Sequence, residues 1–156
     1  LDVLRALPDG CVDAVITDPP YAEKTHAGAR AARPGVGLNT VSLVTFDSIG
    51  DDAFLNLCRE SVRVAKRWVL MTCDWRHAAV AENSDCGVIR VGVWVKPDAA
   101  PQFTGDRPGT GREAVLLLHR KGKKRWNGGG HHAVWIHNVE RGNVHPTQKP
   151  VKLVRK

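Results

Sequence analysis

The chain has 156 residues, a length that suits one domain with one core. Its composition, 42% hydrophobic and 25% charged, excludes a disordered chain, and no apolar run reaches the roughly 18 residues of a membrane helix. The net charge is +7, and residues 112–156 carry eleven Lys or Arg against two acids, whereas residues 1–111 carry twelve bases and fourteen acids. A concentrated basic region is typical of a nucleic-acid binder, the alternative being a solvated surface without a partner.

The beginning of the chain lacks the charged-then-apolar layout of a signal peptide, so we expect a cytoplasmic location, in a bacterium or in the host of a virus. The missing initiator Met and the interrupted amphipathic run at residues 151–156 suggest a piece of a longer chain. The four cysteines are not paired at zinc-ligand spacing, and we expect reduced, buried thiols at Cys11, Cys58, Cys73 and Cys86.

In chain order, residues 12–17 predict a buried strand that ends at two prolines. Residues 22–45, rich in Gly, Ala and Arg, predict a long mobile loop. A helix is expected from Asp51, with Phe54, Leu57, Cys58, Val62 and Ala65 on its apolar face. Further strands are expected at 67–73, 87–96 and 113–119, with a turn-rich loop at 97–112. The alternation predicts an α/β fold with a largely parallel sheet.

Asp18-Pro19-Pro20-Tyr21 directly follows the first predicted strand, at the strand end where open α/β sheets bind ligands. It offers a carboxylate, a rigid carbonyl and an aromatic face. An amino group on a base is a poor nucleophile because its lone pair is delocalised into the ring. Two acceptors that bind its hydrogens localise that lone pair, and an aromatic ring can stack on the extruded base. The alternative is a strand-terminating turn with a surface Asp.

A second motif is His145-Pro146-Thr147-Gln148-Lys149-Pro150, which precedes a basic amphipathic stretch. Thr147 is placed to cap a helix, and Pro150 is favourable in a first turn. Such a helix start is suited to hold a carboxylate, for example that of a methionine moiety.

With both motifs in this order, the chain resembles the N-6 adenine and N-4 cytosine DNA methyltransferases of the permuted, beta-type motif order. The resemblance implies a partial S-adenosylmethionine-dependent methyltransferase sheet, Rossmann-like, with helices on both faces. It also implies a catalytic motif formed by Asp18, Pro19, Pro20 and Tyr21. The implied cofactor contacts are Asp18, His145, Pro146, Thr147, Gln148 and Lys149. The family's glycine-rich cofactor loop would follow Lys156, so we expect residues 1–156 alone to bind the cofactor poorly.

Three regions are predicted: a catalytic region at 1–120, a target-recognition segment at 121–144 and the start of a cofactor-pocket helix at 145–156. In the middle region, Lys121, Lys123, Lys124 and Arg125 can neutralise DNA phosphates, the alternative being a floppy basic hairpin. No metal site is expected, because adjacent His131 and His132 would point to opposite faces of a strand.

The predicted function is therefore methyl transfer from S-adenosylmethionine to the exocyclic amino group of adenine in double-stranded DNA. Adenine is favoured because Asp opens the motif, where the cytosine enzymes more often have Ser. N-4 cytosine methylation and a non-catalytic DNA-binding remnant are the alternatives. Relatives that act on RNA or a protein amide usually have Asn at the position of Asp18.

Overall fold

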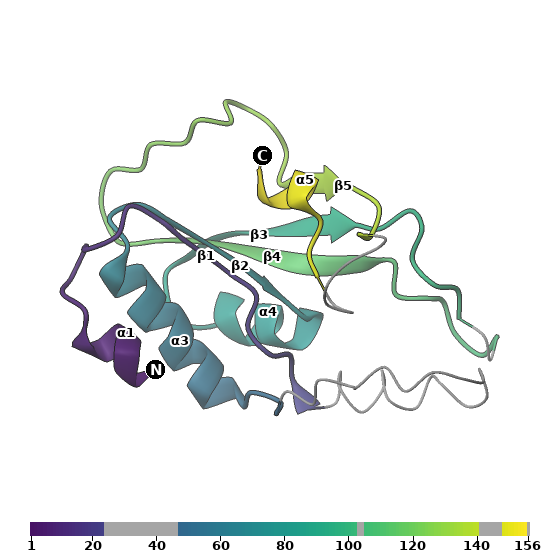
Figure 1. The fold of residues 1–156 in the computed structure, drawn as a ribbon, viewed down its shortest axis with the longest axis horizontal. Helices are drawn as coiled ribbons and strands as arrows, with labels where there is room; N and C mark the ends of the chain where they lie inside the picture. The colour runs from purple at the N-terminus through teal and green to yellow at the C-terminus, as the bar shows by residue number, and fades with distance from the viewer. Residues whose placement is uncertain (24–46, 103–104, 141–147, 156) are drawn as a thin grey trace.

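The computed structural model describes residues 1–23, 47–102, 105–140 and 148–155 (Figure 1). The loop predicted at 22–45 lies outside the described residues apart from its first two. Within these described residues, five strands form one sheet in the order β1-β2-β4-β3-β5. Their bounds are β1 Val15–Thr17, β2 Trp68–Cys73, β3 Val88–Val95, β4 Arg112–His119 and β5 Val134–Ile136. The strands predicted around β1 to β4 are confirmed, β1 being shorter than expected.

The sheet is mixed, so the expectation of a largely parallel sheet is wrong. β1 pairs with β2 and β3 pairs with β5 in parallel, but β4 is antiparallel to both β2 and β3. The connections between the strands explain why the sheet is mixed and not largely parallel. A helix follows β1 and another follows β2, which lets each next strand run in the same direction, whereas the loop between β3 and β4 contains no described helix and the chain turns back.

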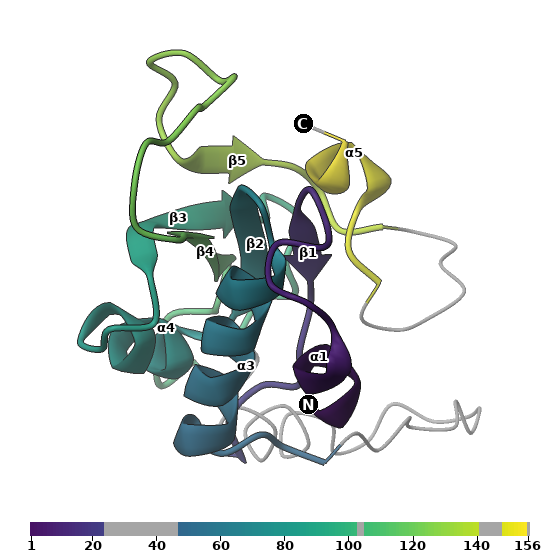
Figure 2. The ribbon, with the colours of Figure 1, turned by 90° about the vertical axis from the view of Figure 1, so that its left-hand side faces the viewer.

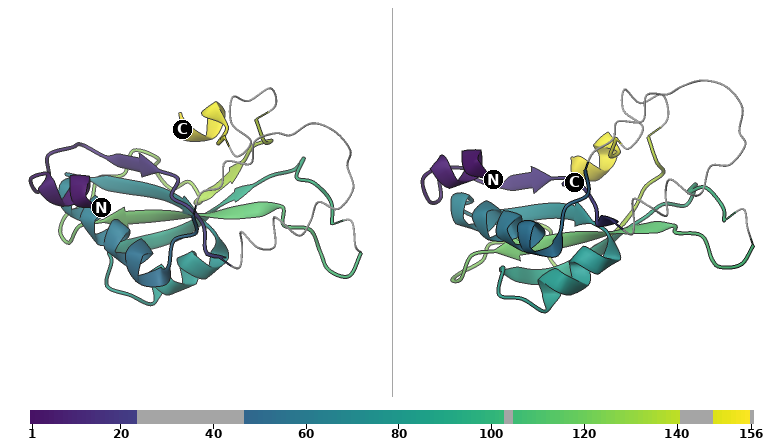
Figure 3. Two further views of the ribbon diagram at one scale, coloured as in Figure 1. Left: turned by 60° about the horizontal axis from the view of Figure 1, so that its bottom comes forward. Right: turned by 90° about the horizontal axis from the view of Figure 1, so that it is seen from below.

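The helices that the structure describes include α1 (Asp2–Ala6), α3 (Asp51–Val64), α4 (Trp75–Glu82) and the short α5 (Val151–Val154). α3 and α4 pack on one face of the sheet, and α5 lies on the other side (Figures 1 and 3). α1 packs beside α3 (Figure 2), and the Arg63 guanidinium of α3 donates to the Leu4 carbonyl of α1 at 2.7 Å. None of the described helices is long and apolar enough to cross a membrane.

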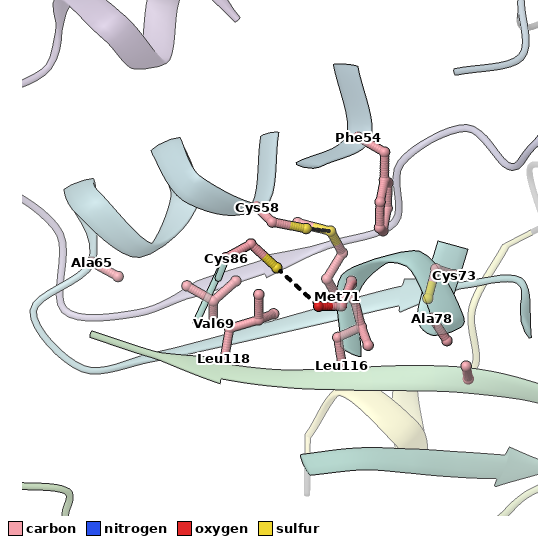
Figure 4. Close-up of a cluster of buried hydrophobic side chains, with 12 residues drawn as sticks. Phe54, Cys58, Ala65, Val69, Met71, Cys73, Ala78, Cys86, Leu116 and Leu118 are labelled. Atoms are coloured by element: carbon pink, nitrogen blue, oxygen red, sulfur yellow. Dashed lines mark hydrogen bonds between the residues drawn. The ribbon is translucent and has the colours of Figure 1, made fainter. Parts of the chain in front are cut away.

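The core lies between α3, α4 and the sheet (Figure 4). The predicted apolar face of α3 is confirmed: Phe54, Cys58 and Ala65 are fully buried, and Leu57 and Val62 pack against the same cluster. Alternate residues of β2 and β4 meet this face, because side chains in a strand alternate between the two faces of a sheet.

The burial predicted for the cysteines holds for Cys58, Cys73 and Cys86, but Cys11 is exposed. α4, which the sequence analysis did not predict, begins where the Asp74 carboxylate accepts the amides of Arg76 and His77. The His77 ring stacks on Phe54 with 4.1 Å between centroids, which locks α4 against α3.

Candidate active site at the carboxyl end of the sheet

Polar side chains from four strands meet at one end of the sheet. Asp18 directly follows β1, and Thr72 lies near the carboxyl end of β2. Lys96 directly follows β3, and Glu113 lies near the amino end of β4, which runs in the opposite direction. Ala114 of β4 pairs with Cys73 at the carboxyl end of β2 and with Val93 near the carboxyl end of β3. This register aligns the three strand ends. Residues far apart in sequence are therefore placed side by side by the register.

The Asp18 carboxylate makes two contacts at this end of the sheet. Its Oδ1 accepts a hydrogen bond from the Thr72 hydroxyl, and its Oδ2 lies 2.8 Å from the Lys149 ammonium. The Asp18 side chain is 36% exposed, whereas Pro19 is buried. The carboxylate is thus fixed in direction while remaining open to a ligand.

Tyr21 is fixed through its hydroxyl and through its backbone. The hydroxyl donates to Glu113 Oε2 at 2.5 Å, and the next amide, that of Ala22, donates to Asp74 Oδ2 at 2.8 Å. The Lys149 ammonium lies 5.3 Å from the centroid of the Tyr21 ring. Burial, followed by the negative charges of Glu113 and Asp18, raises the pKa of Tyr21 far above its usual range, so the phenol is a hydrogen-bond donor at neutral pH.

Glu113 and Lys96 complete the cluster. Lys96 Nζ lies 2.8 Å from Glu113 Oε1, and Lys149 Nζ lies 3.3 Å from Glu113 Oε2. Burial by itself raises the pKa of Glu113, but the ammonium groups of Lys149 and Lys96 and the hydrogen bonds from Lys96 and Tyr21 outweigh it and leave that pKa below its usual range. Glu113 is therefore ionised at neutral pH.

Glu113 and Lys96 were not predicted as site residues from the sequence. Two sequence features could have identified them: Glu113 is a single acid at the start of an otherwise apolar strand, and Lys96 directly follows another strand. A hollow of about 430 Å³ lies along the loop between β3 and β4. Lys96 lines it, but Asp18 and Tyr21 do not.

Of the second motif, Lys149 lies beside Asp18, with 2.8 Å between its ammonium and Asp18 Oδ2. Gln148 is half-buried, and His145, Pro146 and Thr147 lie outside the described residues. α5 has Pro150 as its N-cap and no side-chain cap, so the prediction that Thr147 caps this helix is wrong: the cap lies three residues later. Pro150 fits this position because it lacks the backbone donor that a helix start leaves unpaired.

The predicted DNA-binding residues lie at the opposite end of the sheet. Lys121, Lys123, Lys124 and Arg125 are all exposed. The Arg125 carbonyl accepts the indole N–H of Trp68, the first residue of β2, at 2.6 Å. Trp68 and Thr72 are four residues apart on β2, or about 13 Å. The structure therefore does not bring this basic segment next to Asp18.

Among residues 1–23, 47–102, 105–140 and 148–155, no group of three or more His, Cys, Asp or Glu side chains is arranged to hold a metal ion. His131 and His132 are exposed. The donor set that the site does present, carboxylates beside ammonium groups, suits a ligand that carries both charges.

The mixed sheet and its flanking helices resemble the fold of S-adenosylmethionine-dependent methyltransferases. The M1.HpyAVI–SAM complex is 20% identical over 97% of this chain and 66% of that chain, with a TM-score of 0.56. TTHA0409 of Thermus thermophilus, a candidate DNA modification methylase solved with S-adenosyl-L-methionine, is 18% identical over 80% of this chain and 52% of that chain, with a TM-score of 0.50. The chain thus spans about half to two thirds of these proteins. No family model matches it. At these identities the likeness establishes the fold.

Proposed function

We propose that this chain is the catalytic part of a DNA methyltransferase, which transfers a methyl group from S-adenosylmethionine to the exocyclic amino group of adenine in double-stranded DNA. The observation that carries the proposal is the Asp18 carboxylate, open to solvent at the carboxyl end of β1 and close in the chain to a tyrosine whose hydroxyl is fixed. Because the chain spans only part of the similar structures, the activity is proposed for the whole protein.

The chemistry follows from the acceptors that the motif presents. The Asp18 carboxylate and the Pro19 carbonyl accept the two hydrogens of the target amino group and localise its lone pair on nitrogen. The Tyr21 ring stacks on the base after it leaves the duplex, a contact worth roughly 1–3 kcal/mol. Thr72 and Lys149 keep the carboxylate oriented during this contact.

The described residues fit the proposed cofactor. S-adenosylmethionine, when bound, supplies a methyl group on a positively charged sulfur. Its amino-acid end carries one ammonium and one carboxylate, and Asp18 and Lys149 offer the complementary pair of charges side by side. By the resemblance, residues 145–148 would complete this pocket.

The test is transfer of labelled methyl to DNA by the protein expressed from its full reading frame. We expect N6-methyladenine in the digested DNA, whereas N4-methylcytosine would favour the cytosine alternative. Asp18→Ala should lower the rate by about 10²–10⁴-fold while DNA binding persists. Asp85→Ala is the matched control, because Asp85 is exposed and pairs with Arg59.

Two results would contradict the proposal. An Asp18→Ala protein that methylates DNA at the original rate excludes the mechanism. An unmodified protein that binds DNA but transfers no methyl group supports the non-catalytic alternative.

A further inference from the structure

A tyrosine and a glutamate separated by 92 positions in the sequence share a hydrogen bond in the candidate site. The Tyr21 hydroxyl is the donor and Glu113 Oε2 the acceptor, at 2.5 Å. Glu113 is not part of either sequence motif. Its side chain is 17% exposed, so the carboxylate is largely withdrawn from water and depends on protein partners.

Each carboxylate oxygen of Glu113 faces an ammonium group. Lys96 Nζ lies 2.8 Å from Oε1 and Lys149 Nζ lies 3.3 Å from Oε2, and these lysine side chains are 14% and 13% exposed. A withdrawn carboxylate without such partners would take up a proton and lose much of its strength as an acceptor. With both lysines in place it remains ionised, and a hydrogen bond to an ionised acceptor is about twice as strong as one between neutral groups.

The backbone of Tyr21 is held as well. Its carbonyl accepts the Ile49 amide at 3.3 Å, and the Ala22 amide donates to Asp74 Oδ2 at 2.8 Å. A side chain that is anchored at its backbone and at its far end keeps one ring orientation. Stacking a base on a ring that is already oriented loses less conformational entropy than ordering a free ring.

We propose that Glu113 is a positioning residue, whose carboxylate holds the Tyr21 hydroxyl so that the ring is already oriented to stack on the target base. Lys96 and Lys149 keep the carboxylate charged for this task. The catalytic consequence rests on the proposed function, whereas the hydrogen bond itself can be tested without any activity.

The direct test uses Tyr21 as a spectroscopic probe, because it is the chain's one tyrosine. Glu113→Gln removes a negative neighbour but leaves two ammonium groups that favour the tyrosinate. The tyrosinate absorbance of this variant should therefore appear at lower pH than in the unmodified protein, with circular dichroism followed in parallel to separate titration from unfolding. Tyr21→Phe should abolish the signal. Glu60→Gln is the control, because Glu60 pairs with Arg63 on α3.

The second readout is methyl transfer by the protein from its full reading frame. Glu113→Gln and Tyr21→Phe should each lower the rate at saturating DNA by about 10–100-fold, since misplacement of a positioned group costs this much. The double variant should be no slower than the slower single variant, because both remove the same hydrogen bond.

The outcomes separate the possibilities. A Glu113→Gln protein that titrates like the unmodified protein overturns the proposal. Losses that multiply in the double variant also overturn it, because Glu113 then acts through something other than Tyr21. A shifted titration with unchanged methyl transfer leaves the hydrogen bond but removes the positioning role. An unmodified protein without activity overturns the proposed function and the catalytic half of this inference together, whatever the titration gives.

Discussion

The two ends of the sheet carry charge in different ways. At the carboxyl end of β1, Asp18, Glu113, Lys96 and Lys149 are partly or largely withdrawn from water and form a chain of ion pairs. At the opposite end, near Trp68, the four bases from Lys121 to Arg125 are exposed. The first set is balanced in formal charge, and the second set is uniformly positive.

This difference indicates two separable tasks. Ion pairs in a fixed geometry produce little electric field at long range, because their charges cancel. At close range they orient a small group, as the chemistry at Asp18 requires. Exposed cations of one sign attract a polyanion and release its counterions, and they supply affinity without choosing a base. Under the proposed function, one end performs the methyl transfer and the other holds phosphates.

Among the changes that separate the two ends of the sheet, the largest effect should come from removing the positive charges of the basic end. Changing Lys121, Lys123, Lys124 and Arg125 together to Gln should weaken DNA binding on the order of 100-fold at moderate salt and reduce the salt slope by about 0.9 for each phosphate that is no longer neutralised. The methyl transfer rate at saturating DNA should stay within about twofold, because these residues do not touch the site. Fluorescence anisotropy across a salt series measures the slope, with Arg59→Gln on α3 as a control. An unchanged slope would show that this segment is a solvated surface.

A smaller effect should appear in the free energy of unfolding, which should respond differently to changes at the two ends of the sheet. Lys149→Met leaves Asp18 and Glu113 without one shared cation, and the free energy of unfolding should fall by about 1–2 kcal/mol, less than for a fully buried pair because Asp18 is partly exposed. Lys123→Met at the other end should change it by less than about 0.5 kcal/mol. Urea unfolding measures both, and Lys152→Met, at an exposed position of α5, is the matched control. Equal losses at Lys149 and Lys123 would refute the distinction.

Sequence patterns predicted the fold where the period of apolar residues was long and clear. The apolar face of α3 and the strands β2, β3 and β4 follow from such periods. α4 was missed because its apolar residues are mostly alanines, and β5 because a three-residue strand gives too short a pattern. The direction of β4 was missed because apolar strands look alike in either orientation.

The candidate site was predictable only where it is local in sequence. Asp18 and Tyr21 belong to one tetrapeptide at a strand end, and their placement there needed only β1 to be recognised. Glu113 reaches Tyr21 because β4 runs antiparallel to β2, which places the amino end of β4 at the same edge of the sheet as the carboxyl end of β1, with β2 between them. That interaction depends on strand order and register, which the chain's periodicity does not specify.

The smallest predicted effect is on the pH dependence of the unfolding free energy. It distinguishes the paired carboxylate of Glu113 from an unpaired one. The folded protein holds the pKa of Glu113 below its unfolded value of about 4.3, with the Lys149 and Lys96 charges outweighing burial. Ionised Glu113 therefore stabilises the fold above the unfolded pKa, and this contribution is lost as the pH falls through the folded pKa. The difference in unfolding free energy between the unmodified protein and Glu113→Gln should be largest near neutral pH and shrink on acidification below about pH 4.3. Urea unfolding at stepped pH measures it, and a difference that grows towards acid would mean that burial, not the lysines, dominates at Glu113.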